Sequence, residues 1–287
     1  MADSKKNTNK KRVLVLSGGG SKGAYQVGAL KKLVEHGVVW DSVHGISVGS
    51  LNGLFISSFN KEELKDNFFK LEKIWTEVIK GNKTLYKPWL PFYLNYPASF
   101  FIGSLFSTKP LKKFLYKHYN IESIKKSLVD FNVGVTSLTD GKYELKNKNE
   151  CEDIIKWVLA SSSFPLAFPP QKINGKKYVD GGIRNLTPFH SAFKDCPDII
   201  DVILTRRITD GFIEKKDFKT NVSIGLRAIE IMMDEIFIND LKINCQKNGI
   251  KINIYSPGKD LDYGVLDFNK KNILETIKLG YEETVVK

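Results

Sequence analysis

The sequence predicts an α/β fold with three layers, in which helices cover both faces of a mostly parallel central sheet. Short apolar runs typical of buried strands alternate with stretches of helical periodicity along the chain. The length of 287 residues suits one large α/β domain, and 42% hydrophobic with 26% charged residues is an ordinary globular composition. We therefore expect a single domain over 12–287, and neither a mainly disordered nor a fibrous chain.

The first half of the domain alternates strands and helices. The expected elements, in order, are a strand at 12–17, a helix at 24–36, a strand at 42–46, and helices at 48–59 and 61–80. The helical period is clearest in the last of these, where Leu64, Phe68 and Leu71 fall on one face. The stretch 81–119 follows no regular pattern: aromatic residues alternate with prolines, and lysines flank them.

The second half continues the alternation. The expected elements are strands at 131–138 and 142–145, a helix at 153–160, strands at 178–180 and 199–205, a helix at 222–243, a strand at 252–255 and a helix at 270–283. On the helix at 222–243, four apolar residues share one face, which we expect to pack in the core: Ile224, Ala228, Ile231 and Met232.

The chain is basic, with 44 Lys and Arg against 32 Asp and Glu and a net charge of +12, which suits an anionic partner. Part of the excess lies in residues 1–11, predicted as a disordered basic arm. A solubilising tail is the simpler interpretation of the arm, and contact with an anionic lipid surface is the alternative. The lysines form no nucleic-acid reader motif, so we expect no nucleic-acid partner.

Nothing in the sequence predicts export or a membrane span. No apolar run resembles a signal peptide or reaches the roughly 18 residues of a spanning helix. The three widely spaced cysteines are typical of free thiols in a reducing compartment. We expect a cytoplasmic protein that associates with membranes peripherally.

The segment Gly45-Ile-Ser47-Val-Gly49 matches G-x-S-x-G, the pattern of a nucleophile elbow. A serine on a tight turn between strand and helix has a strained backbone, and glycines on both sides avoid clashes. The alternative is an ordinary helix N-cap at Ser47.

The loop 18–23, Gly-Gly-Gly-Ser-Lys-Gly, lies between a strand and a helix, where backbone N–H groups bind anions or an oxyanion. It also fits the dinucleotide pattern G-x-G-x-x-G. That alternative needs an acidic residue at the end of the second strand, whereas Asp41 precedes the strand. The phosphate-loop pattern fails, because Ala24 and Tyr25 follow Gly23.

No histidine is an obvious general base for Ser47. His44 lies on the entering strand and is expected to point away, and only His190 could follow an acid in the usual triad order. A carboxylate acting directly on the serine is the simpler choice. Asp180 in Asp180-Gly181-Gly182 is the candidate, and an ordinary Asp-Gly turn is its alternative.

Taken in order, the glycine loop, G-x-S-x-G, the segment Ala160-Ser-Ser-Ser-Phe-Pro165 and D-G-G resemble the patatin-like phospholipase family from residue 12 onward. The resemblance implies a patatin-like α/β hydrolase domain with Ser47 as nucleophile and Asp180 as base. It further implies an oxyanion hole at Gly18, Gly19 and Gly20, and a Lys22 that meets a lipid phosphate or orients the loop. The supporting motif glycines are Gly23, Gly45, Gly49, Gly181 and Gly182.

The implied activity is hydrolysis of fatty-acyl esters of lipids or phospholipids without metal or cofactor. An acyltransferase using the same nucleophile is the alternative, and a dinucleotide-binding protein explains neither the elbow nor D-G-G. The stretch 81–119 is then a lid or an acyl-pocket insertion, because aromatic residues beside lysines suit a membrane interface. A small hydrophobic core under long loops explains that composition equally. Lipid class, sn-1 or sn-2 preference, activating partner and oligomeric state stay open.

Overall fold

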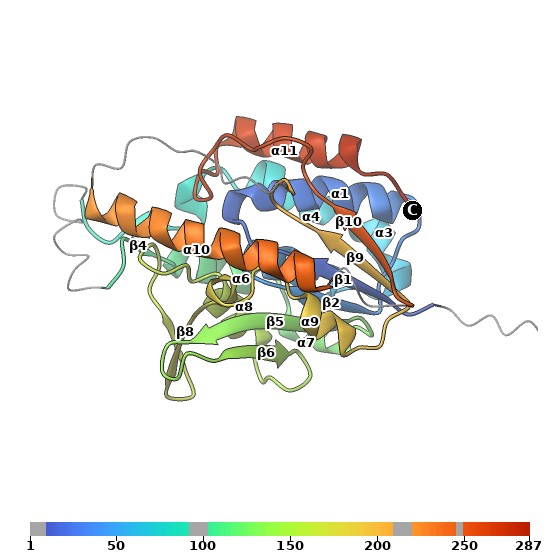
Figure 1. The fold of residues 1–287 in the computed structure, drawn as a ribbon, viewed down its shortest axis with the longest axis horizontal. Coiled ribbons are helices and arrows are strands. Elements are labelled where there is room, and N and C mark those ends of the chain that lie inside the picture. Colours follow the sequence, from blue (N-terminus) through green and yellow to red (C-terminus); the bar gives the residue numbers. More distant parts are fainter. Residues whose placement is uncertain (1–9, 92–102, 209–219, 245–248) are drawn as a thin grey trace, which may run out of the picture.

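The computed structural model describes residues 10–91, 103–208, 220–244 and 249–287 (Figure 1). Residues 1–9 of the predicted basic arm lie outside this part of the chain. Its last residue, Lys11, already joins the domain, because its backbone N–H donates to the Asp198 carboxylate at 2.7 Å.

The central sheet is mixed but mostly parallel, as predicted. Its order is β10-β9-β1-β2-β5-β8-β7, and β6 pairs with β5 beside this path. The strands from β10 to β5 pair in parallel, and β6, β7 and β8 are antiparallel additions. The strands are β1 (Arg12–Leu16), β2 (Ser42–Gly45), β5 (Asp130–Ser137), β6 (Tyr143–Asn147), β7 (Gln171–Ile173), β8 (Lys176–Asp180), β9 (Ile199–Ile203) and β10 (Lys251–Tyr255). A separate pair joins β3 (Lys87–Pro88) and β4 (Phe106–Ser107).

Helices cover both faces of the sheet, which confirms the three-layer prediction (Figure 1). On β1, Leu14 and Leu16 face one hydrophobic cluster, and Val13 and Val15 face the other. The period of two in a strand produces this division. The first cluster includes α1 (Ala24–Glu35), α2 (Val48–Ile56), α6 (Lys109–His118), α7 (Ile121–Lys126), α8 (Ile154–Ser161) and α11 (Lys270–Glu283); the second includes α9 (Phe189–Phe193) and α10 (Asn221–Asn244).

Two sequence predictions need correction. The helix expected at 61–80 is divided into α3 (Lys61–Asn67), α4 (Phe69–Lys73) and a wider π-turn at Ile74–Val78, although its apolar residues are buried as predicted. The face of α10 expected in the core is exposed instead, because the opposite side of that helix packs inward through Phe237. Among the described residues, no helix combines the length and apolarity needed to cross a bilayer.

The register of β5 brings two distant segments together. β2 runs parallel to β5 and ends with Gly45 opposite Val133, whereas β8 runs antiparallel and ends with Asp180 opposite Val135. Both lie on the same edge of β5, because β6 pairs with its other edge at these residues. The carboxyl ends of β2 and β8 therefore point at each other across about 7 Å of strand.

Away from the junction at β5, the buried Asp201 carboxylate joins the three neighbouring strands β1, β9 and β10. Asp201 on β9 is fully buried and accepts hydrogen bonds from Arg12 Nη2 at 2.9 Å, Trp40 Nε1 at 2.7 Å and Asn253 Nδ2 at 2.8 Å. These three donors come from different segments, so this one side chain links β9 to β1, to β10 and to the segment before β2.

We expect Asp201→Ala to lower the free energy of unfolding by about 3–5 kcal/mol, because a largely buried Arg12 guanidinium would lose its counter-charge. Urea unfolding followed by circular dichroism measures the change. The control is Glu72→Ala, which removes a partly exposed ion pair with Lys31 and should cost at most about 1 kcal/mol. Equal losses in the two variants would contradict this role for Asp201.

Candidate active site

Ser47 occupies a sharp turn between β2 and α2. Its backbone has φ +52° and ψ −125°, a conformation that costs a non-glycine residue on the order of 1–3 kcal/mol. Its N–H donates to Ser161 Oγ at 2.9 Å, which holds the strained residue in place. The turn needs Gly49, because a Cβ there would lie 2.3 Å from the Leu16 carbonyl oxygen. This is the geometry expected of a nucleophile elbow.

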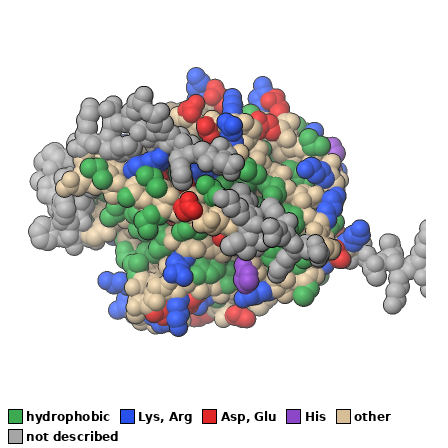
Figure 2. All heavy atoms as spheres, in the orientation of Figure 1, with side chains coloured by type: hydrophobic (Ala, Val, Ile, Leu, Met, Phe, Trp, Pro, Cys, Tyr) green, Lys and Arg blue, Asp and Glu red, His purple; other side chains and the backbone are tan. Residues whose placement is uncertain are grey.

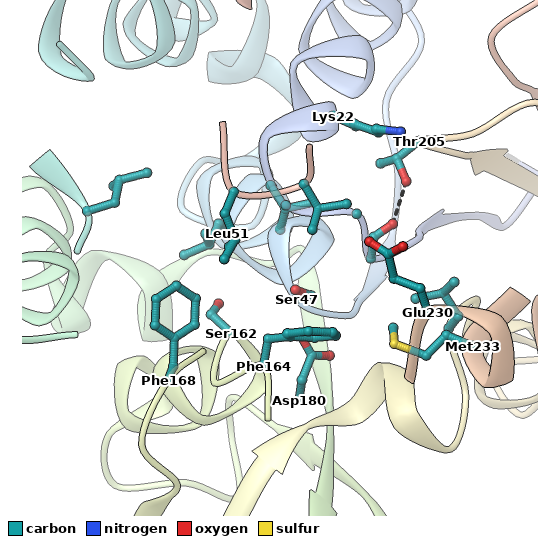
Figure 3. Close-up of a pocket in the computed structure, with 18 of the residues that line it drawn as sticks. Lys22, Ser47, Leu51, Ser162, Phe164, Phe168, Asp180, Thr205, Glu230 and Met233 are labelled. Carbon is teal, nitrogen blue, oxygen red and sulfur yellow. Dashed lines mark hydrogen bonds between the residues drawn. The ribbon is translucent and has the colours of Figure 1, made fainter. Parts of the chain in front are cut away.

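Asp180 ends β8 and faces Ser47 (Figure 3). Its carboxylate is 1% exposed, accepts the Gly182 N–H at 2.8 Å and lies toward the Ser47 hydroxyl. Burial raises the pKa of Asp180 to about 7, and the donor groups of Gly182 and Ser47 only partly oppose this rise. The group can therefore exchange a proton near neutral pH.

The end of α8 and the residues directly after it hold the backbones of Ser47 and Asp180. The Ser161 hydroxyl accepts from Ser47 N and donates to the Gly134 carbonyl at 2.7 Å. The Ser163 carbonyl accepts the Asp180 N–H at 3.0 Å. The sequence marked the segment 160–165 only as a motif, and the structure shows that it supports both Ser47 and Asp180. The support of Ser47 requires the Ser161 hydroxyl, whereas the support of Asp180 requires only the backbone carbonyl of Ser163.

The glycine loop lies beside Ser47 and lines the same cavity. The Gly18 N–H donates to the Leu186 carbonyl at 3.2 Å, so the fold already uses this amide. The amides of Gly19 and Gly20 have no hydrogen-bond partner among the described residues. Gly19 has φ +152°, and a Cβ there would lie 2.1 Å from Thr205 Oγ1, so no other residue fits this close approach. Gly23 follows at the start of α1.

Ser47 and Asp180 open onto a cavity of about 150 Å³ with mainly apolar walls. Its apolar lining is Val48, Leu51, Leu85, Tyr86, Leu111, Phe164, Phe168, Leu186, Met233, Val265, Leu266 and Phe268. The predicted insertion 81–119 thus contributes Leu85, Tyr86 and Leu111, whereas its aromatic residues between 92 and 102 lie outside the described residues.

Charged residues surround one side of the cavity, and sequence reasoning found only Lys22 among them. Lys22 lies 6.0 Å from the centre of the Tyr263 ring. Arg206 hydrogen-bonds to Asp234, and Arg227 lies 3.2 Å from Glu230. No local motif marks these residues, because α10 and the segment after β9 reach the cavity only in the folded chain.

Neither histidine considered as a base reaches Ser47. His44 is buried and hydrogen-bonds to Ser191 Oγ at 2.9 Å and Asp195 Oδ2 at 2.8 Å, on the other side of β2. His190 is exposed and does not line the cavity. Among the described residues that line the cavity, Asp180 is the carboxylate that faces Ser47.

The fold is of the α/β class. Its strained serine follows the carboxyl end of β2, where the pairing along β5 changes from parallel to antiparallel. The family model for patatin-like phospholipase matches residues 14–193, and the chain belongs to this family.

Curated relatives resemble a part of this chain. Lysophospholipase NTE1 of Candida albicans is 26% identical over 183 residues, which cover 63% of this chain and 12% of that protein. Neuropathy target esterase sws of Drosophila melanogaster is 27% identical over 179 residues, covering 61% and 11%. The match thus spans only a small part of these longer relatives. Among solved structures, VipD from Legionella pneumophila gives a TM-score of 0.45 at 15% identity, covering 96% of this chain and 66% of that one.

The raised pKa of Asp180 predicts that this residue costs stability. Because its folded pKa of about 7 exceeds the ordinary value of 3.8, ionisation destabilises the fold progressively as pH rises between these values. We expect Asp180→Asn to raise the free energy of unfolding by about 2–4 kcal/mol near pH 8 and by much less near pH 4. Urea unfolding at both pH values measures this. An equal effect at both would show that burial does not shift this carboxyl.

Proposed function

We propose that the protein is a serine acyl hydrolase that cleaves fatty-acyl esters of lipids. In this proposal Ser47 is the nucleophile, Asp180 is the general base, and the amides of Gly19 and Gly20 bind the oxyanion. The observation that carries the proposal is that the Ser47 hydroxyl and the buried Asp180 carboxylate face each other at the wall of an apolar cavity. Gly18 supports the loop through its bond to Leu186 and gives no donor.

The first half of the reaction transfers the acyl group to the enzyme. Ser47 Oγ attacks the ester carbonyl carbon while the Asp180 carboxylate accepts the hydroxyl proton. The carbonyl oxygen gains the negative charge and lies against the two open amides, each worth about 2.7–4 kcal/mol in the transition state. When the tetrahedral intermediate collapses, the bond to the alcohol oxygen breaks and Asp180 returns the proton to that oxygen.

The second half repeats these steps with water. Asp180 takes a proton from water, whose oxygen attacks the acyl-serine carbonyl, and Ser47 leaves with the proton as the fatty acid is released. A base with a pKa of about 7 is suited to both directions of transfer near neutral pH.

The cavity suits a lipid whose acyl chain lies inside it and whose phosphate lies near Lys22. Its apolar walls suit a fatty-acyl chain, and Lys22 at its edge suits a lipid phosphate. The two relatives described above carry the names lysophospholipase and esterase. We therefore place lysophospholipids first among the substrates to test.

Ser47→Ala should lower kcat/KM on a soluble p-nitrophenyl ester on the order of 10⁶-fold and abolish fluorophosphonate labelling. The wild-type kcat/KM should fall tenfold per pH unit below about 7 as Asp180 becomes protonated. Ser162→Ala is the matched control: it lines the same cavity, but its hydroxyl donates to the Val158 carbonyl. Full activity in Ser47→Ala would refute the proposal.

Ser161→Ala should lower kcat about tenfold with little change in KM, because the Ser47 N–H loses its acceptor at a cost of about 1–3 kcal/mol. Ser163→Ala is the control, since its contact with Asp180 uses only the backbone carbonyl. Steady-state kinetics on the soluble ester separate kcat from KM. Equal kcat losses in both variants would argue against a specific positioning role for the Ser161 hydroxyl.

A further inference from the structure

The first half of α10 presents an apolar face to solvent. Ile224 is 53% exposed, Ile231 44% and Met232 64%, and Ala228 is exposed with them. Their spacing of i, i+4, i+7 and i+8 puts all four on one side of the helix. Glu235 continues the same side, so the apolar face ends within α10.

A strained leucine extends this surface. Leu166 has φ +66°, which is unfavourable for a branched side chain, and is nevertheless 43% exposed. Its Cδ1 lies beside Gly225, 3.1 Å from where a Cβ would be, so it contacts the first turns of α10. We call Leu166, Ile224, Ala228, Ile231 and Met232 the docking patch. Figure 2 shows hydrophobic side chains gathered over the first half of α10, at the left of the view.

The docking patch and the cavity share the same two segments. The inner side of α10 contributes Met233 to the cavity wall, and Phe164 and Phe168 on either side of Leu166 contribute two more side chains (Figure 3). A surface that covered the patch would therefore lie next to the cavity that holds Ser47.

The net charge of the chain and exposed cations next to cavity residues favour an anionic partner, although the exposed Glu235 lies at the end of the patch. The carboxylates Glu230 and Asp234 on the inner side of α10 each contact an arginine, which offsets their negative charge. Arg207 is exposed directly after the cavity residue Arg206, and Lys109 is exposed directly after the cavity residue Thr108. The chain as a whole carries +12. This charge repels a second copy of the chain and attracts an anionic lipid surface.

We propose that the docking patch inserts into the surface of an anionic lipid layer and brings the cavity mouth against it. Apolar side chains beside cations are the combination that binds such interfaces. The inference deepens the proposed function and rests on it, because lipid hydrolysis is the reason for docking. Binding to vesicles can nevertheless be measured without any hydrolysis.

The test is sedimentation with vesicles of phosphatidylcholine alone or mixed with phosphatidylglycerol. The wild type should bind the mixed vesicles more strongly, and Ile224→Asp or Met232→Asp should each weaken that binding about tenfold or more. Leu128→Asp is the matched control: Leu128 is 87% exposed and precedes β5, at the end of the sheet away from the cavity. Its binding should equal that of the wild type.

Hydrolysis separates this proposal from the proposed function. All three aspartate variants should hydrolyse a soluble p-nitrophenyl ester like the wild type, and only the two patch variants should lose activity on vesicles. Ser47→Ala should bind vesicles normally. If that pattern of binding appears in a protein without esterase activity, docking stands and the proposed function fails. Wild-type binding by both patch variants overturns the docking proposal, as does a wild-type dimer that Met232→Asp makes monomeric.

Discussion

The site depends on one arrangement in the sheet: β2 and β8 pair with the same edge of β5 from opposite directions. Their carboxyl ends are separated only by the width of Gly134, whose carbonyl accepts the Ser161 hydroxyl. Ser47 follows one end and Asp180 is the other, so residues far apart in sequence become neighbours by register alone. A one-residue slip of β8 would turn the Asp180 side chain to the opposite face of the sheet.

This arrangement lowers the stability of the folded state. A strained Ser47 and a carboxylate with a pKa raised to about 7 are both unfavourable in the folded state. Ser161 and Ser163 accept the N–H groups of Ser47 and Asp180, and Gly182 donates to the Asp180 carboxylate, so both residues are held in position; large hydrophobic clusters on both faces of the sheet stabilise the fold. The same unfavourable carboxylate is what suits Asp180 to exchange a proton near neutral pH.

α10 connects the chemistry to the surface. Its inner side closes the cavity through Met233 and its outer side exposes Ile224, Ile231 and Met232. A helix with apolar residues on both sides is normally buried. Here the outer face is open, and the pairs Arg206–Asp234 and Arg227–Glu230 line the cavity on the inner side.

Local signals in the sequence determined the mostly parallel α/β fold, the elbow at Ser47, the glycine loop and the turn at Asp180, because each depends on backbone chemistry within a few residues. Periodicity also grouped Ile224, Ala228, Ile231 and Met232 on one face, but it could not say which way that face points. Only the tertiary structure decided this, together with the use of the Gly18 amide by Leu186 and the approach of Ser161 to Ser47. Such contacts join segments that have no sequence pattern in common, so they exist only once the strands have paired.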